Sequence, residues 1–221
     1  MSGSHFPTGR NQFFFGTMLL LCITWPVLAR AEDMTPGNSL LSAEARAAAK
    51  VVRSYYEARD HFNLSKGMQL EAPDIVLIDE DGERHPGNPA LLKDFMAYEK
   101  ATHGHWHCRV LDFKDGWLEA EITEENDYYK YLGIGNRTEH ERYRVADGKI
   151  HERWSISSKY SGRDQDSAYH EFKNWLQQVP ERQTGVMRDG HLVFDGESAK
   201  RMLPLLQEFS RLKAGTQPTD K

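Results

Sequence analysis

The stretch that decides the fold is Arg137-Thr-Glu-His-Glu-Arg-Tyr-Arg-Val-Ala-Asp-Gly-Lys-Ile-His-Glu-Arg-Trp-Ser-Ile156. Asp147-Gly148 predicts a two-residue hairpin turn, because both central positions need a positive φ and glycine adopts one without steric cost. Counting outward from the turn predicts which side chains share one face of the two strands. The predicted pairs are Val145 with Ile150, Tyr143 with Glu152, Glu141 with Trp154, and Glu139 with Ile156.

The two faces of this hairpin differ in character. The face just described is the apolar and aromatic one that a core would cover, yet it carries three carboxylates. Charged groups are rarely buried without a partner, so acids on this face predict a ligand pocket. The opposite face is basic, and we expect it to pair with Glu119 and Glu121 of the neighbouring strand as a solvated or dimer-facing surface. Its members are His140, Arg142, Arg144, His151 and Arg153.

The first 31 residues are expected to be a signal peptide outside the folded domain. Arg10 supplies a positive start, residues 13–28 are almost wholly apolar, and Ala29-Arg30-Ala31 has the small-x-small pattern of a cleavage site. The apolar run is short for a membrane span, which needs about 20 residues. We therefore expect export, cleavage near Ala31 and no membrane attachment afterwards, with a retained N-terminal anchor as the alternative.

The exported chain is acidic. Losing the signal segment removes two of the 28 basic residues and none of the 33 acidic ones, so the net charge becomes −7. This balance argues against nucleic acid or an anionic membrane as a partner. Only Cys108 remains, so no intramolecular disulfide can form, and a chain of this size buries enough surface without one. Asn63 and Asn136 begin glycosylation sequons, which matter only in a host that glycosylates.

The hydrophobic pattern predicts helices before strands. Ser42 is expected to cap a helix that runs to about His61. A short β-branched strand follows at 74–79. Asn88-Pro89 has the residue types of a helix cap and first helical position, so a second helix is expected from there to about Thr102.

From His105 the hydrophobic period changes to two, which predicts a meander of strands. The order of elements indicates an α+β domain over residues 42–160, with helices on one face of an antiparallel sheet. A helical extension is expected over 161–213, with a small hairpin inside it and a last helix that restarts at Pro204. Residues 214–221 are polar and are expected to form a loose tail.

Taken together, these features resemble a known superfamily. A first helix is followed by a strand that ends Ile-Asp-Glu-Asp-Gly, then by a helix at Gly87-Asn-Pro-Ala-Leu-Leu. The meander closes on Tyr-Arg-Val-Ala-Asp-Gly-Lys-Ile-x-Glu-x-Trp. Over about Ala43 to Ser158, this pattern resembles the nuclear transport factor 2-like superfamily, and more narrowly its SnoaL-like and ketosteroid-isomerase-like branches.

The resemblance implies a fold and a range of functions. The fold would be a cystatin-like cone, in which a curved antiparallel sheet wraps around N-terminal helices and leaves a cavity for a small organic ligand. Relatives often dimerise through the sheet, which implies a homodimer. Such folds host isomerases, dehydratases, cyclases, hydrolases and binding modules, so the resemblance does not select a reaction.

The ketosteroid-isomerase-like pattern also implies a catalytic constellation. It places the tyrosine at Tyr55, the base at Asp79 and a second, protonated carboxyl at Glu141. Asp79 would take a proton from the carbon next to a carbonyl, while Tyr55 and a neutral Glu141 donate hydrogen bonds to the enolate oxygen. The additional acids Glu139 and Glu152 favour a smaller or more oxygenated ligand than a steroid. No cofactor is implied.

Simpler interpretations stand beside this one. Asp79 adjoins a Glu-Asp-Gly turn and is interpretable as a turn residue, and Tyr55 as a core residue at helical spacing. Glu141 and Glu152 could pair with a buried arginine such as Arg59. The remaining residues expected to line the ligand are Tyr143, Glu152, Trp154, Glu139 and Trp106.

A second constellation is His103-Gly-His105-Trp-His107. Histidines two apart on a strand share a face, which is one way to present two nitrogens to zinc or copper. Arg109 on the same face would repel a cation, so we expect no metal site. Three hypotheses for the whole chain result: a proton-transferring isomerase, cyclase or dehydratase, a non-catalytic small-molecule binder, and a protein-interaction module.

Overall fold

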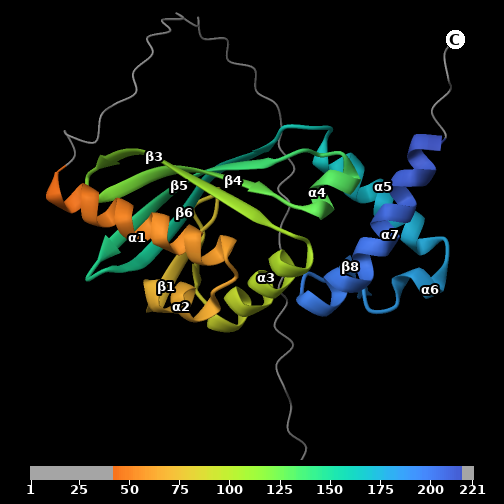
Figure 1. The fold of residues 1–221 in the computed structure, drawn as a ribbon, viewed down its shortest axis with the longest axis horizontal. Helices are drawn as coiled ribbons and strands as arrows, with labels where there is room; N and C mark the ends of the chain where they lie inside the picture. The colour runs from red at the N-terminus through yellow and green to blue at the C-terminus, as the bar shows by residue number, and fades with distance from the viewer. Residues whose placement is uncertain (1–41, 216–221) are drawn as a thin grey trace, which may run out of the picture. The chain divides into compact units, whose positions relative to one another are not determined.

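The computed structural model describes residues 42–215, which belong to one compact unit (Figure 1). The predicted signal segment, its cleavage near Ala31 and most of the predicted tail lie outside these residues. Within the described part of the chain, no helix is both long enough and apolar enough to cross a membrane.

Two of the predicted helices begin at the predicted caps. Helix α1 (Ala43–Asp60) follows Ser42, whose hydroxyl oxygen accepts a hydrogen bond from the Ala45 amide at 3.0 Å. Helix α3 (Pro89–Ala101) follows Asn88, whose side chain accepts from the backbone in the same way. These bonds satisfy amides that have no partner inside the helix, which is why both helices begin there.

Two short helices were not predicted. They are α2 (Leu64–Leu70) and α4 (Asp127–Leu132), and each follows an asparagine cap, Asn63 and Asn126 respectively. The sequence signal for both was the capping asparagine itself, since the segments are too short to show a clear hydrophobic period.

A six-stranded sheet lies behind α1 (Figure 1), with the strand order β2-β1-β6-β5-β4-β3. The expected α+β class is confirmed, but the sheet is mixed, because β1 runs parallel to β6 while the other neighbours are antiparallel. The strands are β1 (Glu71–Ile78), β2 (Arg84–Pro86), β3 (His105–Lys114), β4 (Trp117–Glu125), β5 (Arg137–Ala146) and β6 (Lys149–Tyr160).

The main core fills the space between α1 and the inner face of this sheet. Apolar and aromatic side chains from both elements meet there, which removes them from water and supplies the main favourable contribution to folding. Central members of this core are Val52, Tyr55, Tyr56, Leu118, Ile122, Tyr143 and Ile150.

The predicted hairpin turn is confirmed, but most of the predicted pairs are wrong. Asp147 and Gly148 have φ angles of 50° and 72°, and Val145 pairs with Ile150 as expected. Directly beyond this pair a β-bulge inserts His151 into β6 as an extra residue. Because side chains alternate along a strand, one extra residue moves the following side chains to the other face.

The bulge exchanges the two faces of β6. Arg153 pairs with Tyr143 on the inner face, and Glu152 and Trp154 turn to the outer face. The predicted pairs of Glu152 with Tyr143 and of Trp154 with Glu141 are therefore wrong. The assignment of Arg153 to the basic outer face is wrong for the same reason.

A second bulge follows near the middle of β5 and β6. Glu141 pairs with Ser155, and Glu139 pairs with Ser158 rather than with Ile156 as predicted. Both glutamates stay on the inner face, where they are 3% and 7% exposed. Bulges bend a strand and increase its twist, so these two contribute to the curvature of the sheet.

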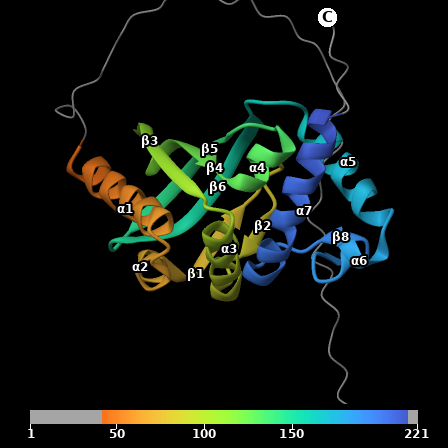
Figure 2. The same cartoon turned by 45° about the vertical axis from the view of Figure 1, so that its right-hand side comes forward.

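The C-terminal segment forms a second core with α3 and α4. Figure 2 shows α7 beside these two helices, and Tyr98 of α3 packs with Phe172 and Met202 in this second core. Helix α7 continues through Pro204 instead of restarting there. The elements of the segment are α5 (Gln165–Gln177), α6 (Pro180–Gln183), β7 (Met187–Arg188), β8 (His191–Leu192) and α7 (Gly196–Gly215).

Candidate ligand site on the inner face of the sheet

Three oxygen-bearing side chains meet between α1 and β5. The Tyr56 hydroxyl lies 2.7 Å from Glu141 Oε2 and 2.8 Å from the Tyr143 hydroxyl, and the Tyr143 hydroxyl also bonds to Glu141 Oε2. All three residues are buried. On the other carboxyl oxygen, Glu141 Oε1 lies 3.8 Å from Arg153 Nε. We call Tyr56, Glu141, Tyr143 and Arg153 the inner-face cluster.

The number of protons in this triangle indicates the charge of Glu141. Three oxygen–oxygen contacts need three protons, one for each hydrogen bond. The hydroxyls of Tyr56 and Tyr143 supply one each, and a carboxylate supplies none. A protonated Glu141 supplies the third, so the geometry favours the neutral carboxylic acid.

The surroundings of Glu141 also favour its neutral form. Burial raises the pKa of Glu141, and the nearby charge of Glu139 raises it further, while the guanidinium of Arg153 and the hydroxyl of Tyr56 oppose the change. Removing a carboxylate from water disfavours its charged form, and a like charge nearby adds to that effect. The pKa of Glu141 therefore lies above its ordinary value.

Tyr55, the tyrosine predicted by resemblance, has a different partner. Its hydroxyl donates to Glu71 Oε1 at 2.8 Å, and its ring packs edge-on against Tyr56 at 5.3 Å between centroids. Both rings are buried, but only Tyr56 contacts Glu141. Helical spacing placed both neighbours near the core and offered no means of choosing between them, so sequence reasoning missed Tyr56.

A second polar group adjoins the first at the end of α1. The Arg59 guanidinium pairs with Glu99 of α3 and stacks over the Trp106 ring, with 3.9 Å from Cζ to the ring centroid. Trp106 in turn lies 5.5 Å from the Tyr56 ring, between centroids. Arg59 is therefore not the arginine partner of Glu141 or Glu152, because its carboxylate partner is Glu99; Glu141 faces Arg153 instead.

Glu124 lies opposite Trp106 in the β3–β4 pair and is buried. Its carboxylate accepts hydrogen bonds from Asn126 and Tyr129, each at 2.8 Å, and lies 4.0 Å from Arg137. Burial raises the pKa of Glu124 to about 7, although Arg137 opposes this. Arg59, Glu99, Trp106, Glu124 and Arg137 form what we call the junction cluster, since they lie between the two cores.

Acids outnumber bases in this connected interior network. The second predicted lining acid, Glu139, belongs to it through an ion pair of 2.6 Å with Arg137. Five carboxyls face three guanidiniums, and Glu124 shares Arg137 with Glu139 at the longer distance of 4.0 Å, which agrees with the raised pKa of Glu124. The carboxyls are those of Glu71, Glu99, Glu124, Glu139 and Glu141, and the guanidiniums are those of Arg59, Arg137 and Arg153.

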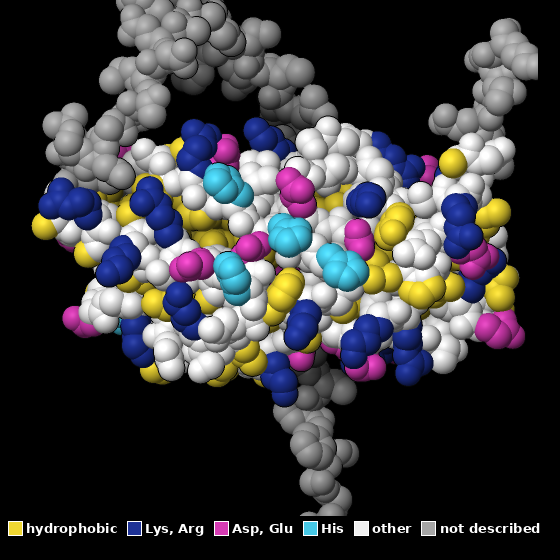
Figure 3. Space-filling view, viewed as in Figure 1, with side chains coloured by type: hydrophobic (Ala, Val, Ile, Leu, Met, Phe, Trp, Pro, Cys, Tyr) yellow, Lys and Arg dark blue, Asp and Glu magenta, His cyan; other side chains and the backbone are white. Residues whose placement is uncertain are grey.

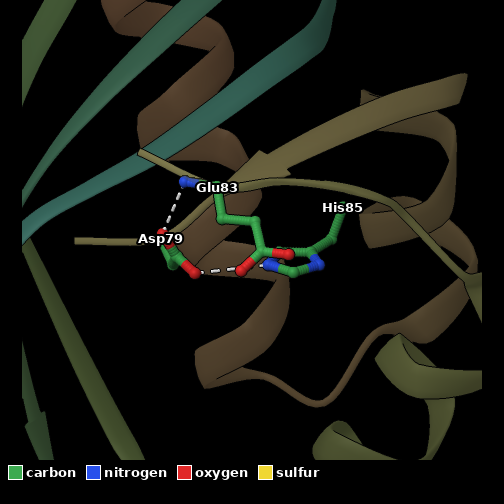
Figure 4. Close-up of side chains that lie close together, drawn as sticks. All are labelled: Asp79, Glu83 and His85. Atoms are coloured by element: carbon green, nitrogen blue, oxygen red, sulfur yellow. Dashed lines mark hydrogen bonds and ion pairs between the residues drawn. The ribbon is translucent and has the colours of Figure 1, made fainter. Parts of the chain in front are cut away.

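Asp79, the predicted base, lies in an exposed turn after β1. Figure 4 shows its carboxylate beside Glu83 and His85: Oδ1 accepts from the Glu83 amide at 2.8 Å, and Oδ2 lies 3.3 Å from the His85 ring. Burial alone would raise the pKa of Asp79, but the hydrogen bonds outweigh it and lower the pKa. Among the described residues, no hydrogen bond joins Asp79 to Tyr55 or Glu141.

The same three side chains could surround a cation. Their candidate ligand atoms all lie within 4.8 Å of one another, and an imidazole with two carboxylates is a donor set that divalent metals accept. All three are partly or fully exposed, and Asp79 Oδ1 is already bonded to backbone amides. These contacts are those of an ordinary turn, and we assign no metal to them.

The histidines at the start of β3 bond to different acids. His103 lies 2.8 Å from Asp127 and His105 lies 3.3 Å from Asp60. Figure 3 shows histidine side chains near the middle of one face, with acidic side chains between them. Among the described residues, His103, His105 and His107 form no group of three close ligands.

Glu152 and Trp154, predicted to line the ligand, lie on the outer face. Glu152 pairs with Arg84 at 2.7 Å, and the Trp154 indole donates to the Asp79 carbonyl at 3.1 Å. Trp154 also packs edge-on against Trp117, with 6.1 Å between ring centroids. Two other arginines stack on these rings, Arg142 on Trp154 and Arg144 on Trp117. The outer face is therefore a half-exposed array of alternating tryptophan, arginine and glutamate.

Comparison with known proteins gives structural neighbours only. No family model and no curated protein matches the sequence. A Sinorhizobium meliloti protein described as a "putative polyketide cyclase" is 21% identical at a TM-score of 0.40, covering 48% of this chain and 93% of its own. A nuclear transport factor 2-like protein of unknown function from Burkholderia xenovorans is 11% identical at 0.40, covering 62% and 99%.

A third neighbour, a protein of unknown function with a cystatin-like fold from Methylobium petroleophilum, is 17% identical at a TM-score of 0.42, covering 55% of this chain and 80% of its own. Because every TM-score is below 0.5 and every identity below 25%, no ligand or reaction is transferred from these proteins to this chain.

Proposed function

We propose that this protein binds a small oxygenated organic molecule at the inner-face cluster, with neutral Glu141 and the hydroxyl of Tyr56 as hydrogen-bond donors. The observation that supports this most directly is the three-oxygen triangle, which needs a proton on Glu141; a bound carbonyl oxygen would take the place of the Tyr143 hydroxyl as the acceptor of one of these protons. A neutral carboxyl can donate to a carbonyl oxygen, whereas a carboxylate would repel it.

The position of the cluster supports the same proposal. Arg153 keeps 26% of its side chain exposed while its guanidinium approaches Glu141, so the cluster extends to the protein surface on this side. The aromatic rings of Tyr56 and Trp106 offer flat apolar surfaces beside the donors. Aromatic surface with a few directed polar groups is typical of small-molecule sites.

Catalysis of proton transfer next to a carbonyl would need a base as well as these donors. The resemblance assigns that role to Asp79, but the carboxylate of Asp79 is engaged by turn amides in an exposed loop. This contact pattern favours binding without turnover over the isomerase or cyclase reaction. Both functions use the same donors, so one experiment can separate them.

The experiment uses 2-tetralone, an uncharged bicyclic ketone whose protons next to the carbonyl exchange slowly with D2O. Binding is followed by NMR line broadening of the ketone, and exchange by loss of its proton signal. We expect residues 32–221 to bind 2-tetralone, and Glu141→Met, which is of similar size but has no hydrogen-bond donor, to bind it about tenfold more weakly.

Asp79→Asn distinguishes the two functions. If the wild type accelerates exchange and Asp79→Asn removes that acceleration while binding persists, the protein is a proton-transfer catalyst. If the wild type binds without acceleration and Asp79→Asn binds equally well, it is a binding protein. Binding that is unchanged in Glu141→Met, or absent from the wild type, would contradict the proposal.

We also propose, from the sequence, that the protein is exported and dimerises through the outer face of the sheet. A dimer would cover the half-exposed tryptophans of that face, Trp117 and Trp154. Light scattering of the wild type and of Arg142→Glu tests the dimer: a monomeric wild type would exclude it. N-terminal sequencing of protein recovered outside the cytoplasm tests cleavage near Ala31.

A further inference from the structure

The junction cluster leaves several buried polar atoms without a hydrogen-bond partner among the described residues. Three of them are obligate donors, namely Arg59 Nε, Trp106 Nε1 and Arg137 Nε. One more is an acceptor, Glu99 Oε2. Buried polar groups are nearly always paired, so a group of unpaired ones indicates that something else pairs with them.

These atoms belong to one neighbourhood. Arg59 pairs with Glu99 and stacks on Trp106, and Trp106 lies opposite Glu124 in the β3–β4 pair. The Arg137 guanidinium, on β5, lies 4.0 Å from the Glu124 carboxylate. The side chains of Arg59 and Glu99 are 9% and 4% exposed, so bulk water does not satisfy them. Donors exceed acceptors, so the missing partner supplies acceptor oxygens.

The charges of the cluster restrict that partner further. The guanidinium of Arg59 is balanced by Glu99, and that of Arg137 by Glu139. An added carboxylate or phosphate would bring an unbalanced negative charge next to Glu99 and Glu124, which is costly in a buried site. A carbonyl oxygen satisfies the donors without adding charge.

We propose that Arg59 and Trp106 form a specificity subsite that accepts a carbonyl oxygen of an uncharged ligand, next to the donors of the inner-face cluster. The inference rests on the proposed function, because it describes a second contact of the same ligand. The 5.5 Å between the rings of Trp106 and Tyr56 places the two sets of donors on adjacent aromatic groups. A ligand with two oxygens fits such a site, because each oxygen can accept from one set of donors. A ligand with one carbonyl on a ring whose other edge is apolar also fits.

The test follows the indole N–H signal of Trp106, assigned as the one lost in Trp106→Phe. That variant keeps an aromatic ring under Arg59 and removes the unpaired donor with part of the indole surface, so we expect it to fold. Four probes share one bicyclic skeleton: 6-acetyl-2-tetralone, which has a second carbonyl, 2-tetralone, which has one, tetralin, which has none, and 2-tetralone-6-carboxylate. We expect 6-acetyl-2-tetralone to shift the Trp106 signal, tetralin to leave it in place, and the carboxylate to bind at least tenfold more weakly than the acetyl ketone.

Variants give a second readout. Trp106→Phe and Arg59→Lys, which keeps the charge facing Glu99, should each weaken binding of 6-acetyl-2-tetralone about five- to tenfold. Trp117→Phe on the outer face is the matched control and should leave binding unchanged.

The outcomes separate the two proposals. If 6-acetyl-2-tetralone binds, depends on Glu141 and is insensitive to Trp106→Phe and Arg59→Lys, the subsite is wrong and ordered water alone pairs with these atoms. Tighter binding of the carboxylate than of the acetyl ketone would overturn the inference about charge. If 2-tetralone does not bind the wild type, the proposed function fails and the subsite fails with it.

Discussion

The Tyr56 hydroxyl lies 2.7 Å from Glu141 Oε2, which connects the first helix to the fifth strand across 85 residues of chain. The bond is buried, so water cannot replace it, and breaking it costs free energy. Its neighbour Tyr55 offers a nearly identical ring, one residue away on the same helix, with a hydroxyl bonded to Glu71 instead. The pair therefore provides a matched comparison within one turn of α1.

Tyr56→Phe is expected to lower the free energy of unfolding by about 1–3 kcal/mol, because it leaves Glu141 and Tyr143 with an incomplete set of hydrogen bonds in a buried site. Tyr55→Phe removes the same atom from a bond whose acceptor is partly exposed, so a loss of about 1 kcal/mol or less is expected. Urea unfolding of both variants measures the difference. Equal losses would mean that the triangle adds no stability.

Arg153→Met is expected to raise the pKa of Glu141 further, because it removes the positive charge that opposes the effect of burial. Arg144→Met is the control, since Arg144 lies on the outer face and faces Glu152. Titration of the Glu141 carboxyl carbon by NMR gives the result. An unchanged Glu141 pKa in Arg153→Met would show that the two groups do not interact.

The raised pKa of Glu124 predicts that the free energy of unfolding depends on pH. Its pKa in the folded protein, about 7, exceeds its ordinary value of 4.5, so the folded state holds a proton that the unfolded state releases. Its contribution is fully present below pH 4.5 and is lost as the pH rises to about 7, on the order of 3 kcal/mol over that range. Glu124→Gln should be free of this loss. Unfolding curves of both proteins at pH 5 and pH 7 test this, and parallel pH profiles would contradict it.

Gly162 is expected to tolerate no side chain. A Cβ there would lie 2.4 Å from the Ile134 carbonyl carbon and 2.5 Å from the Gly133 oxygen, both backbone atoms that cannot move aside. We expect Gly162→Ala to lower stability by about 3 kcal/mol or more. Gly190→Ala, where a Cβ meets nothing within 4 Å but φ is +77°, should lose only about 1 kcal/mol. Similar melting temperatures for the two variants would exclude the clash.

Local signals in the sequence predict much of this fold. Ser42 and Asn88-Pro89 mark the starts of α1 and α3, and Asp147-Gly148 marks the hairpin turn, because each of these positions depends on its own backbone geometry. The superfamily resemblance and the α+β class follow from the order of such elements. Short helices such as α2 are recognisable in retrospect from the single cap at Asn63.

The composition of the site depends on a feature that no local signal contains. The bulge at His151 arises where β6 curves around the core, and it replaces Glu152 and Trp154 by Arg153 on the inner face. Glu141 was predicted correctly to lie on the inner face, since it precedes the bulged strand. The choice of Tyr56 over Tyr55 depends on the exact rotation of α1 over β5, which packing determines and helical period does not.

The measurement that tests the central claim most directly is the protonation state of Glu141 in the ligand-free protein. Carbon-13 NMR of side-chain carboxyls, with Glu141→Gln to assign the signal, follows it from pH 3 to pH 9. We predict a Glu141 carboxyl that titrates above the ordinary pKa of 4.5, because burial and the nearby Glu139 disfavour its charged form. A Glu141 that titrates near 4.5 would mean a carboxylate among the three oxygens, and the proposed donor site would be wrong.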